Sequence, residues 1–255
     1  MPGPAVAMGV PKPTADEILN GSDSRKAPRL VEISAVADLP TRFGVFQVVS
    51  FHSSLDDKEH AALVKGDVTD RGGVPVRIHS ECLTGDVFGS LRCDCREQLE
   101  LSLEEIRRRE YGVLLYLRQE GRGIGFENKI KAYRLQELGL DTIEANEALG
   151  FRPDERDYEV AARMLDALEV RSILLMSNNP SKIADLRQHG VVVQGRIPIV
   201  VRANRYNARY LETKRVKAGH LLESPRPSGA IEQLDCLSAS RPRARRATAE
   251  RAGEP

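Results

Sequence analysis

Three of the four cysteines lie in one short segment, residues 77–100. Cys82, Cys93 and Cys95 are spaced C-x10-C-x-C. Three thiolates brought together suit a soft tetrahedral metal, above all zinc. A structural zinc site takes four protein ligands, so three ligands leave one position open. Zinc with an open position can activate water for attack on an electrophilic carbon. The segment therefore indicates a hydrolase.

Two other interpretations of the cysteines stay open on spacing alone, a structural zinc knuckle and a set of buried thiols. Knuckles usually contain two C-x-x-C-like pairs, and no fourth ligand of the right type lies nearby in the sequence. Cys236, far along the chain, is expected to be a free thiol, with a role as fourth ligand as the alternative. The pair Cys93 and Cys95 suits a tight turn or a helix entrance, where backbone N–H groups favour thiolates.

A glycine-rich segment, E-G-R-G-I-G at 120–125, follows a predicted strand and precedes a predicted helix. It does not match the dinucleotide pattern G-x-G-x-x-G. Its glycines permit positive φ, which would suit a simple turn. The same geometry would let the backbone approach a phosphate at a helix N-terminus, with Arg122 as a bidentate donor. Both interpretations fit the residues.

Three further positions have a structural and a functional interpretation. Asp154 is predicted to cap a helix, and Arg156 is either a surface charge or a functional cation. Lys182 in N-N-P-S-K follows a predicted strand at the start of a helix, where it is either solvated or in contact with a phosphate. Tyr133 lies on a predicted helix, where most tyrosines simply bury the ring.

The elements that must position these residues alternate between strands and helices. Apolar runs predict strands, amphipathic spacing predicts helices, and Pro180 suits a first helical turn. The total is an α/β (α+β) fold of mixed strands with flanking helices. The predicted strands are 44–51, 61–68, 74–79, 112–117, 172–177 and 191–201, and the predicted helices are 96–110, 126–138, 154–168, 180–189 and 209–222.

Composition limits the possible partners. The 255 residues are 41% hydrophobic and 29% charged, with 38 basic and 37 acidic side chains. A formal charge of +1 gives no field for a polyanion, so a nucleic-acid partner is not expected. Neither a secretory leader nor a run of ~20 apolar residues is recognisable, so no membrane partner and a cytoplasmic location are expected. Residues 1–28 and 223–255 are predicted to be disordered, the second being a Pro/Arg-rich tail, with a catalytic domain at 29–222.

Five motifs in order resemble the GTP cyclohydrolase II family, over about residues 41–222. They are H-S-E-C-L-T-G-D, S-L-R-C-D-C, R-Q-E-G-R-G-I-G, D-E-R-D and N-N-P-S-K. The resemblance implies a single catalytic domain of that type, a homodimer, one zinc ion on the three cysteines and magnesium with the triphosphate. The implied reaction converts GTP to 2,5-diamino-6-(5-phosphoribosylamino)pyrimidin-4-one, formate and diphosphate. It would be the first step of riboflavin biosynthesis, or its counterpart in a specialised pathway.

The resemblance also assigns site residues. It makes Asp154 a proton acceptor and Arg156 the nucleophile that attacks the α-phosphate. A guanidinium is a poor nucleophile, so stabilisation of transition-state charge is an equally good role for Arg156. Tyr133 would assist the later steps near zinc, and its presence implies complete deformylation. Ser177 departs from the threonine that is usual at its position. The implied GTP contacts are Arg77, Ile78, His79, Ser80, Glu81, Gln98, Glu120, Gly121, Arg122, Thr142, Ser177 and Lys182.

Two expectations concern the whole protein. Members of this family are often fused to a domain that makes dihydroxybutanone phosphate, and the extension before the motifs is too short for that domain, so a monofunctional enzyme is expected. The alternative from another class is a zinc-stabilised nucleotide- or nucleic-acid-binding protein without turnover. The arginine-rich tail supports that alternative. Release of formate from GTP separates the two.

Overall fold

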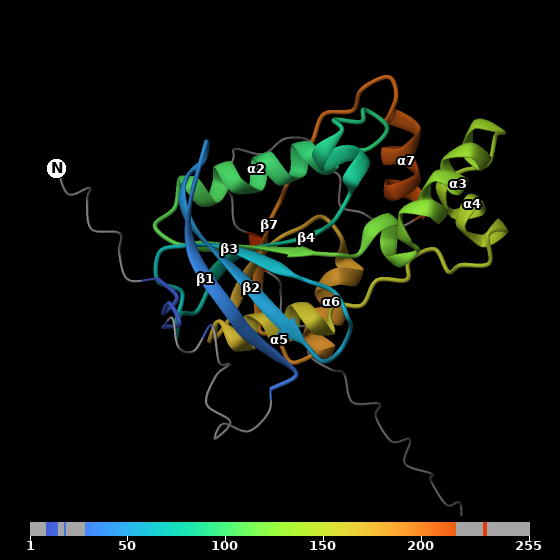
Figure 1. Ribbon diagram of the computed structural model, residues 1–255. Coiled ribbons are helices and arrows are strands. Elements are labelled where there is room, and N and C mark those ends of the chain that lie inside the picture. The colour runs from blue at the N-terminus through green and yellow to red at the C-terminus, as the bar shows by residue number, and fades with distance from the viewer. Residues whose placement is uncertain (1–8, 15–17, 19–28, 218–231, 234–255) are drawn as a thin grey trace, which may run out of the picture.

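The computed structural model describes residues 9–14, 18, 29–217 and 232–233. One eight-stranded sheet lies at its centre (Figure 1). In spatial order the strands are β1 (Val31–Thr41), β2 (Gly44–Ser53), β3 (Ala61–Lys65), β5 (Gly112–Leu117), β4 (Val74–Ser80), β6 (Ile173–Met176), β7 (Val193–Ile197) and β8 (Glu232–Gln233).

The sheet is antiparallel from β1 to β5 and parallel from β5 to β7. β1, β2, β3 and β5 pair antiparallel, whereas β4 pairs parallel with both β5 and β6, and β6 pairs parallel with β7. β4 is buried along nearly its whole length, as expected for a central parallel strand covered on both faces. Because parallel strands end at the same edge, the segments after β4, β5 and β6 start close together. The mixed α/β class predicted from the sequence is confirmed.

Helices cover both faces of the sheet (Figure 1). α2 (Cys95–Arg107) packs on one face, where Leu103 and Ile106 contact a core that includes Leu114 and Met176. α5 (Glu159–Ala167) and α6 (Pro180–Gln188) belong to the larger core on the other side. The remaining helices, α3 (Gly125–Glu137), α4 (Thr142–Ala148) and α7 (Ala208–Lys217), lie together beyond the carboxyl ends of the central strands.

The predicted helix 154–168 was placed too early. α5 begins at Glu159, and residues 151–158 form a loop. The Asp154 carboxylate does not cap this helix but accepts hydrogen bonds from Arg156, both from its backbone N–H and from its guanidinium. A side chain that bonds its own loop in this way competes with helix formation.

Other boundaries also differ from the sequence prediction. β1 and α4 were not predicted. α4 carries a complete capping box between Asp141 and Glu144, a signal present in the sequence. β3 stops at Lys65 because Gly66 turns the chain with φ +64°. Of the predicted strand 191–201, only Val193–Ile197 is strand.

Most of the predicted tails, together with Cys236, lie outside the described residues. Two parts of the predicted tails are described. The Val10 backbone exchanges hydrogen bonds with the Gln47 side chain at 2.8 and 3.1 Å, and β8 pairs antiparallel with β7. None of the helices in the described part of the chain is long and apolar enough to cross a bilayer.

Candidate active site

A cavity of about 700 Å³ opens at the edge of the sheet where β4, β5 and β6 end. A volume of this size suits a nucleotide-sized ligand. Of the residues that the sequence assigned to a site, the following line it: Arg77, His79, Ser80, Glu81, Cys82, Cys93, Cys95, Gln98, Glu120, Gly121, Arg122, Tyr133, Thr142, Asp154, Arg156, Ser177 and Lys182. Ile78 does not, because its side chain is fully buried in the core. Only the Ile78 carbonyl faces a site residue, accepting a hydrogen bond from Lys182 Nζ at 2.8 Å.

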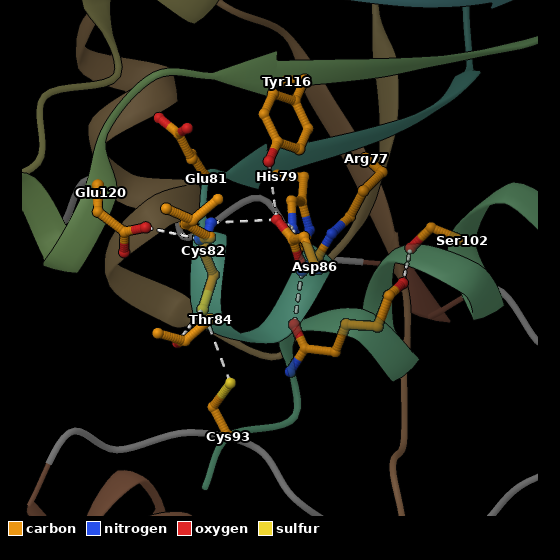
Figure 2. Close-up of polar contacts among 12 residues, drawn as sticks. Arg77, His79, Glu81, Cys82, Thr84, Asp86, Cys93, Ser102, Tyr116 and Glu120 are labelled. Carbon is orange, nitrogen blue, oxygen red and sulfur yellow. Dashed lines mark hydrogen bonds and ion pairs between the residues drawn. The ribbon is translucent and has the colours of Figure 1, made fainter. Parts of the chain in front are cut away.

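The three predicted metal ligands come together at one end of the cavity. Cys82 follows β4 and precedes the turn η1 (Leu83–Val87), and Cys95 is the first residue of α2. The three sulfur atoms lie within 4.8 Å of one another, and this cluster contains no other ligand-type residue among those described. The Cys82 and Cys93 sulfurs are 3.7 Å apart (Figure 2). A set of three thiols this close fits zinc with one open position.

The protonation states of the thiols also suit a metal. Hydrogen bonds from Cys93 and Cys95, helped by the Lys129 ammonium, lower the pKa of Cys82 far below the usual thiol value. The same sharing with Cys82 raises the pKa of Cys93 to about 11 and that of Cys95 as well. Cys82 is therefore the thiol of the three that loses its proton most readily. A metal would displace the remaining protons on binding.

Gly85 in η1 leaves room for the cysteines. A Cβ atom at this position would lie 2.8 Å from Cys93 Sγ and 3.1 Å from Cys82 Sγ, which is too close without movement of the sulfurs. A glycine is therefore required at position 85 because the cysteine sulfurs lie close to its Cα, and not because of its backbone conformation. Sequence reasoning missed this role, although Gly85 lies inside the cysteine motif.

Gly85→Ala is therefore expected to weaken zinc binding by at least ~10-fold. This is the lower end of the affinity that a metal site loses when residues in contact with its ligands are disturbed. Competition with a chromophoric chelator measures this change. Val87→Ala, at the exposed end of the same turn, is the matched control and should bind zinc as the parent does. Unchanged affinity in Gly85→Ala would show that the sulfurs have room to move.

A buried network behind the cysteines fixes the backbone of Cys82. The Asp86 carboxylate accepts hydrogen bonds from Cys82 N at 3.0 Å and from the Tyr116 hydroxyl at 2.9 Å, and it contacts His79 Nε2 at 3.0 Å (Figure 2). The His79 ring also stacks on Tyr116, with 5.5 Å between ring centres. Burial lowers the pKa of His79 against the opposing effect of Asp86. Asp86 and Tyr116 were not predicted as site residues, although Asp86 belongs to the cysteine motif.

The glycine-rich segment forms a left-handed turn, η2 (Glu120–Gly123). Gly121, Arg122 and Gly123 have φ of 63°, 61° and 94°, so the prediction that these glycines serve positive φ is confirmed. Arg122 adopts the same conformation at a strain cost that glycine avoids. Its carbonyl accepts a hydrogen bond from Glu155 N at 3.0 Å, which joins the turn to the loop 151–158.

In that loop, Arg156 and Asp154 form a bidentate ion pair. The Arg156 Nε and Nη2 atoms lie 2.8 and 2.5 Å from the two Asp154 oxygens. Against the effect of burial, Tyr158 and Asp154 raise the pKa of Arg156. In turn, Arg156 lowers the pKa of Asp154 against partial desolvation of the carboxylate, whose side chain is 40% exposed. In this geometry the arginine is a fixed cation, and Asp154 orients it.

Arg77 and Lys182 are buried cations at the cavity wall. The Arg77 guanidinium donates to Met176 O at 3.0 Å and to Gln98 Oε1 at 2.5 Å. Lys182 is 6% exposed and lies 5.0 Å from the centre of the Tyr158 ring, so its interpretation as a solvated lysine is wrong.

The other assigned residues take varied places. Tyr133 lies near the cysteine cluster, since its hydroxyl is 3.3 Å from Thr84 Oγ1 and Thr84 Oγ1 is 3.7 Å from Cys82 Sγ. Burial raises the pKa of Tyr133 to about 12. Thr142 begins α4, and Ser177 accepts a hydrogen bond from Asn179 N at 3.1 Å.

Several lining residues were missed from the sequence, among them Lys129, Arg92 and Tyr158. Lys129 is four residues before Tyr133 on α3, so helical spacing places both on one face. Given Tyr133 at the site, that spacing alone would have pointed to Lys129.

Fold and site together define a mixed α/β protein with a cluster of three cysteines, able to hold a metal, beside a polar, nucleotide-sized cavity. The family model for GTP cyclohydrolase II matches residues 32–198, and the chain belongs to that family. It is 54% identical over 192 residues to GTP cyclohydrolase-2 of Tolumonas auensis, covering 75% of this chain and 98% of that protein.

Longer relatives contain the same region. The riboflavin biosynthesis protein RibBA of Bacillus subtilis is 55% identical over 194 residues, which are 76% of this chain and 49% of that protein. RibBA of Synechocystis is 52% identical over 196 residues, 76% of this chain and 35% of that protein. The chain thus spans about half, or less, of the length of these RibBA relatives.

Proposed function

We propose that the chain is a zinc-dependent GTP cyclohydrolase II. It would hydrolyse GTP to 2,5-diamino-6-(5-phosphoribosylamino)pyrimidin-4-one, formate and diphosphate, as the first step of riboflavin biosynthesis or of a specialised pathway. The observation that carries the proposal is the cluster of three cysteines in the same cavity as the fixed cations Arg156 and Lys182. The 54% identical relative named GTP cyclohydrolase-2 supports it.

The two ends of the cavity have different chemistry. Zinc held by Cys82, Cys93 and Cys95 would supply a Lewis acid that activates water near the guanine ring. The triphosphate would lie toward Arg122, Arg156 and Lys182, with magnesium offsetting part of its charge.

The substrate contacts between these ends follow from the lining. Base and sugar would contact Arg77, His79, Ser80 and Glu81 together with Gln98, close to the cysteines. Glu120, Gly121, Thr142 and Ser177 would complete the polar wall.

Two residues handle protons and orientation. Because the pKa of Tyr133 is raised to about 12, its hydroxyl keeps its proton and can donate a hydrogen bond to the opened ring during deformylation. Asp154 has a lowered pKa and is engaged with Arg156. It acts as a proton acceptor only once substrate phosphate draws Arg156 away, and until then it orients the guanidinium.

The wider proposals follow the family. The protein would act as a homodimer in the cytoplasm, with the catalytic domain at 29–222. It would have no membrane or nucleic-acid partner.

Mass spectrometry of the products after incubation with GTP, Mg²⁺ and zinc tests the function. The expected result is the diaminopyrimidinone product with formate and diphosphate. A product that keeps the formamide would contradict complete deformylation. Bound but unchanged GTP would favour a nucleotide-binding protein without turnover, and a parallel sample with chelator shows whether turnover needs the metal.

A further inference from the structure

Lys129 on α3 is a buried lysine beside the metal ligands. It is 8% exposed, and its Nζ lies 3.1 Å from Cys82 Sγ and 2.8 Å from Glu120 Oε1. The Tyr133 ring centre is 5.7 Å from the same nitrogen. Burial of an ammonium group is costly unless it is paired and hydrogen-bonded. Here the partners are a carboxylate and a metal-ligating sulfur, so the position of the charge is specific.

Glu120 connects this lysine to the two segments that frame the site. Its Oε2 accepts a hydrogen bond from Leu83 N at 2.6 Å, and its Oε1 accepts one from Gly121 N at 2.8 Å. Leu83 follows Cys82 directly, and Gly121 begins the left-handed part of η2. The side chains of Glu120 and Lys129 are only 9% and 10% exposed. The pair therefore ties the Cys82 segment, the turn and α3 together in a site shielded from water.

We propose that Lys129 is a positioning residue of the metal centre, a role that rests on the proposed zinc-dependent function. Its ammonium fixes the Cys82 sulfur and offsets the negative charge of three thiolates around one zinc ion, while Glu120 holds Lys129 in place. A hydrogen-bonded partner of a metal ligand sets the ligand's orientation and tunes its donor strength. The effect is large here because the pair is buried, where charges are weakly screened.

Lys129→Met tests this role through zinc affinity, measured by chelator competition at fixed pH. Loss of such a partner typically costs a metal site ~10–100-fold in affinity, and a loss in that range is expected. Lys131→Met is the matched control, because Lys131 lies on the same helix, is exposed and pairs with Glu127 at 2.7 Å. The control should bind zinc as the parent does.

The double variant Lys129→Met/Glu120→Gln separates an effect on Cys82 from an effect on Glu120. Lys129→Met alone leaves the buried Glu120 carboxylate with backbone hydrogen bonds but without its cation, which itself destabilises the fold, and Glu120→Gln removes that charge. If Lys129 acts on the Cys82 sulfur, the double variant still binds zinc at least ~10-fold more weakly than Glu120→Gln alone. Equal affinity of these two variants would overturn the proposal.

Cobalt substitution gives a readout that a purely structural role would not change. A hydrogen bond from an ammonium stabilises the sulfur lone pairs, so its loss in Lys129→Met should move the sulfur-to-cobalt charge-transfer band to longer wavelength. An unchanged band would overturn the role of Lys129 and leave the zinc function intact. A parent chain that binds neither zinc nor cobalt would overturn the metal centre itself.

Discussion

Cys82→Ser is expected to abolish formate release from GTP. A serine hydroxyl stays protonated at neutral pH and is a poor ligand for a soft metal, so the centre loses one of its three donors. The loss of formate release should exceed ~100-fold, the upper end of what removing a residue hydrogen-bonded to a metal ligand costs. Diphosphate release should fall much less, because the two cations proposed to bind the phosphates do not depend on the cysteines. Arg156 is held by Asp154, and Lys182 by the Ile78 carbonyl. Parallel assays of formate and diphosphate measure both steps.

Cys236→Ser is the matched control for this prediction, since it makes the same chemical change at the fourth cysteine. It should leave both products unchanged. If Cys236→Ser abolished formate release as well, Cys236 would be a fourth ligand and the open coordination position would be lost. Equal loss of formate and diphosphate in Cys82→Ser would contradict separate sites for the two steps.

The grouping of the cysteines was predictable because it depends on a residue type that is rare and closely spaced. Cys82, Cys93 and Cys95 lie within fourteen positions of the chain, and short segments bring such ligands together whatever the rest of the fold does. The left-handed turn at Gly121 and Gly123 follows equally from local backbone freedom.

What was missed depends on contacts between distant segments or on weak patterns. Lys129 reaches Cys82 across 47 positions, and the local sign of its place at the site is its four-residue spacing from Tyr133 on α3. β1 is an edge strand whose apolar alternation at Val31, Ile33 and Ala35 is interrupted by a register shift between Ile33 and Ala35. Asp154 has the residue type of a helix cap, but its ion pair with Arg156 decided the local conformation instead.

Arg156→Gln is expected to lower diphosphate release by ~10²–10³-fold, the usual cost of removing a group that stabilises transition-state charge. The Arg156 pKa is raised, so the guanidinium stays protonated and lacks the free electron pair that a nucleophile needs. Arg152→Gln is the matched control. Arg152 lies in the same loop and pairs with Glu155 at 2.5 Å, but its side chain is 76% exposed. Its replacement should leave diphosphate release unchanged.

Two further measurements separate charge stabilisation by Arg156 from nucleophilic attack. Arg156→Lys keeps the positive charge and should retain more diphosphate release than Arg156→Gln, although it loses the bidentate geometry. In the Cys82→Ser variant, where ring opening is blocked, a nucleophilic Arg156 would accumulate a covalent guanylyl adduct. Intact-protein mass spectrometry should show no such adduct. If the adduct were detected, and were absent when Arg156 is also replaced, Arg156 would be the nucleophile. Asp154 would then have to remove a proton from the Arg156 guanidinium.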